Sequence, residues 1–167
     1  SPDIVETVYW HYNDAVCRGE MSIPEFSQAF GTKFKVPNFD WGPYYLEALI
    51  PIKETHELIT WASEHYRVGL LSNIMPGMLR QLTARGLIPD LKYDVIIDSS
   101  EVHAIKPESE IYQIAAQKAG VDPGTILLVD DSRANLMAAE KLDWRVLWFD
   151  DYRPKESVER VRQALEF

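Results

Sequence analysis

The feature that most constrains the fold is an alternation of short apolar runs with stretches of helical pattern. The runs lie at residues 67–71, 94–97, 125–129 and 145–149. They are too short for buried helices and too continuous for half-exposed strands, so they fit strands covered on both faces. Strands that alternate with helices need right-handed crossovers and form a parallel sheet. The sequence therefore predicts an α/β fold, a Rossmann-like parallel sheet flanked by helices.

The first fifty residues have a different, helical pattern. Proline after Ser1 fits the first turn of a helix, and Ser22 with Glu25 has the spacing of a capping box. The aromatic and proline-rich stretch from Gly31 to Pro43 reads as a loop with short turns. We place a boundary near residues 49–53. The prediction is a partial helical cap over residues 1–50 and an α/β core over residues 51–167.

Composition narrows the class of protein. A chain of 167 residues can bury a core with a small appendage, and its net charge of −9 argues against nucleic acid or an anionic membrane as a partner. No apolar run is long enough to span a bilayer, and the first residues do not resemble a signal peptide. Cys17 is the only cysteine, so no internal disulfide is expected. These features favour a cytoplasmic protein.

Polar residues collect where the predicted strands end. Ser72 and Asn73 follow the first run, Asp130 and Asp131 follow the third, and Lys106 precedes a helix between them. In a parallel sheet, ligands bind beyond the carboxyl ends of the strands. Adjacent carboxylates suit a hard divalent cation, a serine before a helix suits phosphate, and a lysine can neutralise both.

Each of these signals also has an ordinary structural explanation. Serine, asparagine and aspartate commonly cap helices, and a lysine in the first turn usually faces solvent. The order of the three signals is less easily explained by independent caps. It also excludes a receiver-type signalling domain, in which the aspartate pair comes first and the lysine last.

At these residues the chain closely resembles the haloacid dehalogenase-like (HAD) hydrolase superfamily. Residues 69–73 match its second motif, residues 105–112 its third and residues 128–135 its fourth. Residues 18–26 resemble the short helical cap of the epoxide-hydrolase-N-terminal-like and small phosphatase branches. The resemblance covers nearly the whole chain.

The resemblance implies a role for each matching residue. Ser72 would hold the transferring phosphoryl group with backbone help from Asn73, and Lys106 would stabilise charge on an aspartyl phosphate. Asp131 would bind Mg²⁺ directly, and Asp130 directly or through water. Asn135 would support that end of the site from behind the ligands.

The sequence departs from the family at the first motif, Asp-x-Asp-x-Thr or Asp-x-Gly-x-Val, which supplies the nucleophile. Asp3 and Thr7 have a plausible spacing, but no strand precedes them and Val5 occupies the place of the acid. We expect the central first strand to lie upstream of Ser1, outside a fragment or an incompletely recorded chain. A truncated, inactive protein and a strand supplied by another polypeptide are the alternatives.

The leading hypothesis is a magnesium-dependent phosphatase of small phosphorylated metabolites that acts through an aspartyl phosphate. Residues 1–167 alone are expected to be inactive, since the nucleophile is missing. One alternative is a 2-haloacid dehalogenase, although Asp130-Asp131 favours a metal. The other is a non-catalytic binding or scaffold protein of the same fold.

Overall fold

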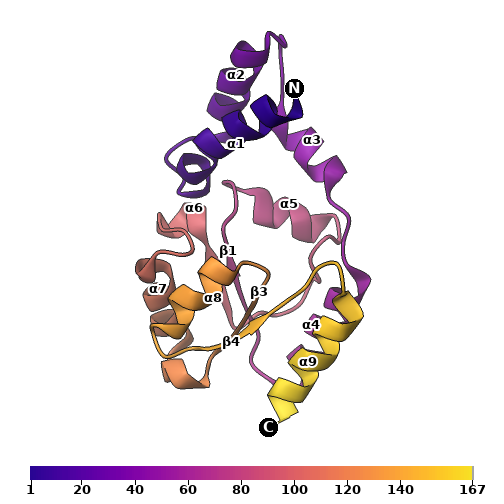
Figure 1. Cartoon of the computed structure of the whole chain (residues 1–167), viewed down its shortest axis with the longest axis vertical. Coiled ribbons are helices and arrows are strands. Elements are labelled where there is room, and N and C mark those ends of the chain that lie inside the picture. Colours follow the sequence, from indigo (N-terminus) through magenta and orange to yellow (C-terminus); the bar gives the residue numbers. More distant parts are fainter. Residues whose placement is uncertain (167) are drawn as a thin grey trace.

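A computed structural model describes residues 1–166 of the chain, which form a layered α/β body with a helical cap at one end (Figure 1). The cap contains α1 (Pro2–Cys17), α2 (Ile23–Phe34) and α3 (Trp41–Ala48). No helix within these 166 residues is long and apolar enough to cross a membrane.

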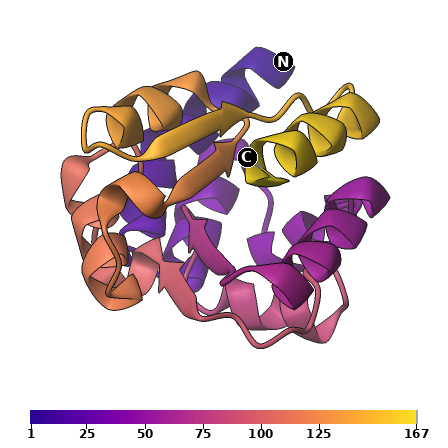
Figure 2. The same ribbon diagram turned by 90° about the horizontal axis from the view of Figure 1, so that it is seen from below.

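The body contains four strands in two parallel pairs. β1 (Gly69–Ser72) pairs with β2 (Val95–Asp98), and β3 (Leu127–Asp130) pairs with β4 (Arg145–Trp148). The predicted strand positions and parallel direction are confirmed. Figure 2 shows β1 and β3 as the inner strands of the two pairs. Among residues 1–166, no strand pairs with the inner edge of either, so the sheet is divided in two.

Helices cover the two faces of the strands. On one side lie α7 (Ser109–Ala119) and α8 (Arg133–Glu140), and on the other α4 (Lys53–His65) and α9 (Pro154–Glu166) (Figures 1 and 2). The connections contain α5 (Met78–Ala84), α6 (Ser99–Val102) and the 3₁₀ turn η1 (Pro123–Thr125). Ile97 of β2 and Leu128 of β3 share one apolar cluster with Tyr112 of α7, which holds the two strand pairs together.

Coverage of the strands is less complete than the apolar runs predicted. No residue of β1 or β4 falls in the buried class, whereas β2 and β3 each contain two buried residues. The inner edge of β1 has no partner strand among the described residues, and this leaves Leu70 and Leu71 half-buried. Continuous apolar character therefore marked the strands correctly but overstated their burial.

The capping box of Ser22 and Glu25 is confirmed, since each caps the backbone of the other at the start of α2. The loop predicted from Gly31 to Pro43 is wrong at both ends. α2 continues to Phe34 and ends at Lys35 in the left-handed conformation, and the missing side chain of Gly31 leaves room for the Val36 carbonyl oxygen where the chain folds back. α3 begins at Trp41, where Asp40 accepts a hydrogen bond from the Gly42 amide and caps the helix.

The cap packs on the segment that follows β1. One apolar cluster contains Val16, Phe26, Phe30 and Leu46 of the cap together with Ile74, Met75, Met78 and Leu82. Phe26 is fully buried at its centre. Because Ile74 follows Ser72 and Asn73 directly, packing of the cap fixes the chain just beyond the end of β1.

Ser99 joins the cap to the body. Its fully buried hydroxyl donates to the carbonyl of Cys17 at 2.6 Å and accepts from the amide of Ile74 at 2.9 Å. Ser99→Ala leaves two buried backbone groups unpaired and is expected to lower the free energy of unfolding by about 1–3 kcal/mol. Urea titration measures the loss. The control is Ser63→Ala, which removes an exposed hydroxyl of α4. Equal losses in the two variants would contradict the prediction.

Candidate functional site

Lys106 lies at the centre of the polar edge of the sheet. Its Nζ donates to Oδ2 of Asp130 at 2.6 Å, and the two side chains are 11% and 4% exposed. The lysine comes from the connection between α6 and α7, whereas the aspartate ends β3. An ion pair this buried fixes both charges, because each would be costly to leave unpaired.

The other carboxylate oxygen of Asp130 is also occupied. Oδ1 accepts from the backbone amide of Ser132 at 2.8 Å and from the side-chain amide of Asn135 at 3.0 Å. The hydroxyl of Tyr112 donates to the carbonyl of Asn135 at 2.9 Å. Burial, and then the charge of Asp130, raises the pKa of Tyr112, so the phenol stays a donor. Asp130 is thus held by protein groups on both oxygens.

Asn73 clamps the backbone of Lys106. Its Oδ1 accepts from the Lys106 amide at 2.7 Å, and its Nδ2 donates to the Lys106 carbonyl at 2.8 Å. The sequence suggested only backbone help from Asn73, and its side-chain contact was missed. Lys106 therefore connects the segment after β1 to the end of β3, and three of the predicted site residues come together across the divided sheet.

Ser72 is the last residue of β1, in register with Asp98 of β2. It is half-buried, and its hydroxyl has no hydrogen-bond partner within the described residues. Asp98 is 5% exposed, and it caps α6 by accepting hydrogen bonds from the amide and the hydroxyl of Ser100. The serine hydroxyl is therefore available to a ligand at this edge, whereas the carboxylate of the neighbouring Asp98 is already engaged in hydrogen bonds with Ser100.

Asp131 differs from Asp130 in its surroundings. It is exposed, and its carboxylate has no hydrogen-bond partner in residues 1–166. Its carbonyl accepts from Nε1 of Trp148 at 2.9 Å, which fixes the backbone. Burial raises the pKa of Asp151, and the charges of Asp131, Asp150 and Asp130 raise it further. The ends of β3 and β4 thus carry a negative field around an unpaired carboxylate.

A magnesium ion at this edge would need oxygen ligands from these residues. Across residues 1–166 no group of three or more His, Cys, Asp or Glu side chains is arranged to hold a metal. Magnesium, however, is usually bound by one or two carboxylates with water and phosphate completing its shell. The free carboxylate of Asp131 in an acidic field fits that requirement. Asp130 fits only through water, because its oxygens are engaged.

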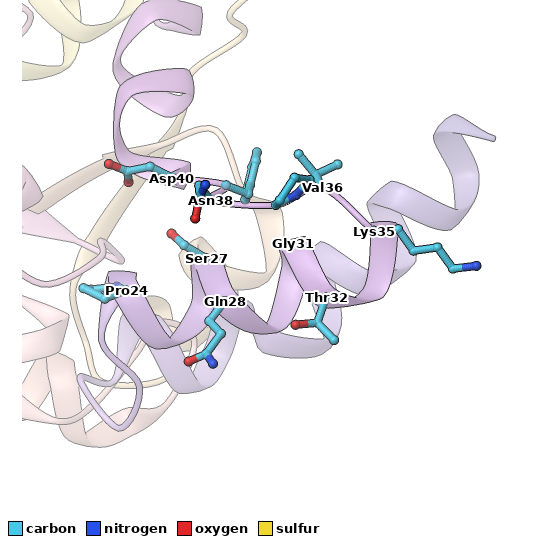
Figure 3. Close-up of a pocket in the computed structure, with 11 residues that line it drawn as sticks. Pro24, Ser27, Gln28, Gly31, Thr32, Lys35, Val36, Asn38 and Asp40 are labelled. Carbon is cyan, nitrogen blue, oxygen red and sulfur yellow. The ribbon is translucent and has the colours of Figure 1, made fainter.

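A cavity of about 620 Å³ lies elsewhere, on the cap (Figure 3). It is lined by α2 and the following loop, including Gln28, Lys35 and Asn38. None of the predicted site residues lines it. Its size alone does not make it the reacting site, since the buried ion pair and the unpaired serine and aspartate lie at the sheet edge.

Three further contacts at this edge were not apparent from the sequence. Arg18 at the end of α1 forms a two-pronged ion pair with Glu108, two residues after Lys106. Trp148 fixes the backbone of Asp131, and the guanidinium of Arg133 lies 4.9 Å from the centre of its ring. All three contacts join residues far apart in the chain, so no local sequence pattern predicts them.

Comparison with known proteins gives the family. The model of the family described as haloacid dehalogenase-like hydrolase matches residues 18–143. YhcW of Bacillus subtilis, a candidate phosphatase, is 30% identical over 114 residues, which are 59% of this chain and 50% of that protein. Acyl-CoA dehydrogenase family member 10 of Mus musculus is 24% identical over 159 residues, which are 90% of this chain and 14% of that protein.

A solved structure has the same fold. A HAD family enzyme of Bacteroides thetaiotaomicron, in complex with magnesium and inorganic phosphate, superposes with a TM-score of 0.71 at 22% identity. The match covers 81% of this chain and 73% of that one. The chain spans half or less of the length of the two curated relatives. Since the family model matches most of the chain, the protein belongs to the haloacid dehalogenase-like hydrolase family.

Proposed function

We propose that this chain provides the phosphate- and metal-binding part of a magnesium-dependent phosphatase acting on small phosphorylated metabolites. The observation that carries the proposal is the position of Lys106. Its backbone is held by Asn73 after β1, and its ammonium is held by Asp130 at the end of β3. Lys106 thus links the ends of the two inner strands, and its ammonium would be available to a phosphoryl group bound at this edge.

Each residue at this edge has a separate role in the proposed binding of phosphate and metal. The hydroxyl of Ser72 donates to a phosphoryl oxygen, and Lys106 neutralises charge that develops on the phosphoryl group. Asp131 would hold Mg²⁺ directly, and Asp130 would do so through water. The bound ion would supply further positive charge to the phosphoryl oxygens. Asn135 and Ser132 keep Asp130 oriented.

The nucleophile belongs on a strand between β1 and β3, the position where both inner edges lack a partner among the described residues. An aspartate oxygen there attacks phosphorus, the bond from phosphorus to the ester oxygen breaks, and the leaving alkoxide takes up a proton. Water then attacks the aspartyl phosphate, releases phosphate and returns the free carboxylate. No aspartate in residues 1–166 lies on such a strand, so the isolated chain is expected to be inactive.

The test supplies that strand as a synthetic peptide. It has a lysine for solubility, five β-branched apolar residues and a terminal Asp-Leu-Asp sequence. The mixture of this peptide, residues 1–167 and Mg²⁺ is expected to hydrolyse 4-nitrophenyl phosphate. With a peptide in which asparagine replaces the first of these two aspartates, the rate of hydrolysis is expected to fall by on the order of 10³-fold. Asp131→Asn should weaken Mg²⁺ binding by calorimetry, whereas the exposed control Asp90→Asn should not.

The outcomes separate the competing functions. Turnover by residues 1–167 without peptide would place the nucleophile within the chain and contradict the proposal. Equal rates with the aspartate and asparagine peptides would do the same. Chloride release from 2-chloropropionate without Mg²⁺ would favour the dehalogenase. Binding of the peptide without either reaction would favour a scaffold protein.

A further inference from the structure

The end of α1 rests on the segment that carries Lys106. Three consecutive residues make this contact. The Cys17 carbonyl accepts from the Ser99 hydroxyl, and the Arg18 carbonyl lies 2.8 Å from Nδ1 of His103. Gly19, with φ of 71°, packs so closely on the Ser100 backbone that a side chain would not fit. Because a carbonyl can only accept, Nδ1 of His103 carries the proton.

A further contact of this region is the ion pair of Arg18 with Glu108. Two guanidinium nitrogens donate to the two carboxylate oxygens, with Nη1 of Arg18 at 2.6 Å from Oε2 of Glu108. The pair is partly exposed, at 25% and 39% for the two side chains, so its contribution to overall stability is small. The hydrogen bonds from Arg18 lower the pKa of Glu108, so its carboxylate stays charged to a lower pH than that of a free glutamate.

Glu108 in turn closes the turn on which Lys106 stands. Its amide donates to the Ile105 carbonyl at 2.9 Å, and its carboxylate accepts from the Ile105 amide at 3.4 Å. Asn73 holds the Lys106 peptide from the other side. The backbone around Lys106 is thus held on one side by Asn73 of the body. On the other side it is held by Glu108, which is itself paired with Arg18 of the cap.

We infer that Arg18 is a positioning residue for Lys106, and that the ion pair of Arg18 with Glu108 is the contact through which the cap sets the place of the lysine. The inference rests on the proposed role of Lys106. A bidentate pair has a defined geometry, so it transmits the position of α1 more exactly than a single charge contact. Arg18 itself touches none of the groups assigned to the reaction.

The test measures how readily the Lys106 ammonium leaves its pair with Asp130. Residues 1–167 are acetylated with a succinimidyl ester, and peptide mass spectrometry follows each lysine. Arg18→Met and Glu108→Gln should each raise the rate at Lys106 roughly fivefold, because the turn opens more often. The rate at Lys53, whose side chain is 84% exposed, should not change. Hydrogen exchange of the Lys106 and Glu108 amides should rise in parallel.

Two further variants make the result specific. Arg18→Glu with Glu108→Arg restores an ion pair and should return the Lys106 rate to within about twofold of the wild type. Glu57→Gln breaks the exposed pair with Lys53 and should leave the Lys106 rate unchanged. The inference is wrong if neither single variant raises the rate, or if the exchanged pair does not restore it. Neither measurement uses a substrate, so a chain without phosphatase activity can still pass this test.

Discussion

Replacing Lys106 with methionine is expected to lower the free energy of unfolding by about 3–5 kcal/mol. The reason is the aspartate left behind. The Asp130 side chain is 4% exposed, and without the ammonium at 2.6 Å its charge stays buried with only the Ser132 amide and Asn135 as donors. Urea denaturation followed by circular dichroism measures the loss. The same variant should abolish phosphate binding under the proposed function.

Two control variants separate the lost pair from a general effect of removing a lysine. Lys53→Met removes an exposed lysine and should change stability by about 0.5 kcal/mol or less. Lys106→Met with Asp130→Asn removes both charges while keeping an acceptor for the Ser132 amide, so it should recover about half of the loss or more. A Lys106→Met variant as stable as Lys53→Met would show that the ion pair does not hold the site together.

Truncation of Phe26 to alanine is expected to cost about 3–5 kcal/mol. Its ring is fully buried and lies between those of Tyr12, Phe30 and Trp41, at centroid distances of 5.1–6.0 Å. The cavity would open where the cap meets the segment after β1. The loss should therefore appear both in urea denaturation and as faster hydrogen exchange in α1, α2 and residues 74–82.

The control for this truncation is Trp10→Ala. Trp10 belongs to the same cap but is 60% exposed, so its removal should cost about 0.5 kcal/mol or less. Faster exchange confined to the cap, with residues 74–82 unchanged in the Phe26 variant, would show that the cap and the segment after β1 do not form one cooperative unit.

Local patterns were sufficient for the secondary structure where the deciding contacts lie within a few residues. The capping box joins Ser22 to Glu25, three positions apart, and Gly120 ends α7 in the left-handed conformation just where the helical spacing stops. The stretch from Gly31 to Pro43 failed for the opposite reason. Its helices depend on packing of Phe30, Phe39 and Trp41 against each other, and their composition alone resembles a loop.

The candidate site was predictable in its membership and not in its contacts. The order of Ser72, Lys106 and Asp130-Asp131 pointed to one edge of a parallel sheet, because the carboxyl ends of parallel strands meet there. The two aspartates have the same chemistry in the sequence. Only the structure separates Asp130, engaged on both oxygens, from Asp131, which is exposed.

The sequence by itself determined the α/β class, the strand positions and the family, since apolar periodicity, caps and short motifs are all read within single elements. The tertiary structure alone decided how Lys106 is held. Its partners Asn73 and Asp130 are 33 and 24 positions away, and Arg18 reaches Glu108 across 90. Such contacts depend on the packing of whole elements against each other, and packing leaves no periodic trace in the sequence.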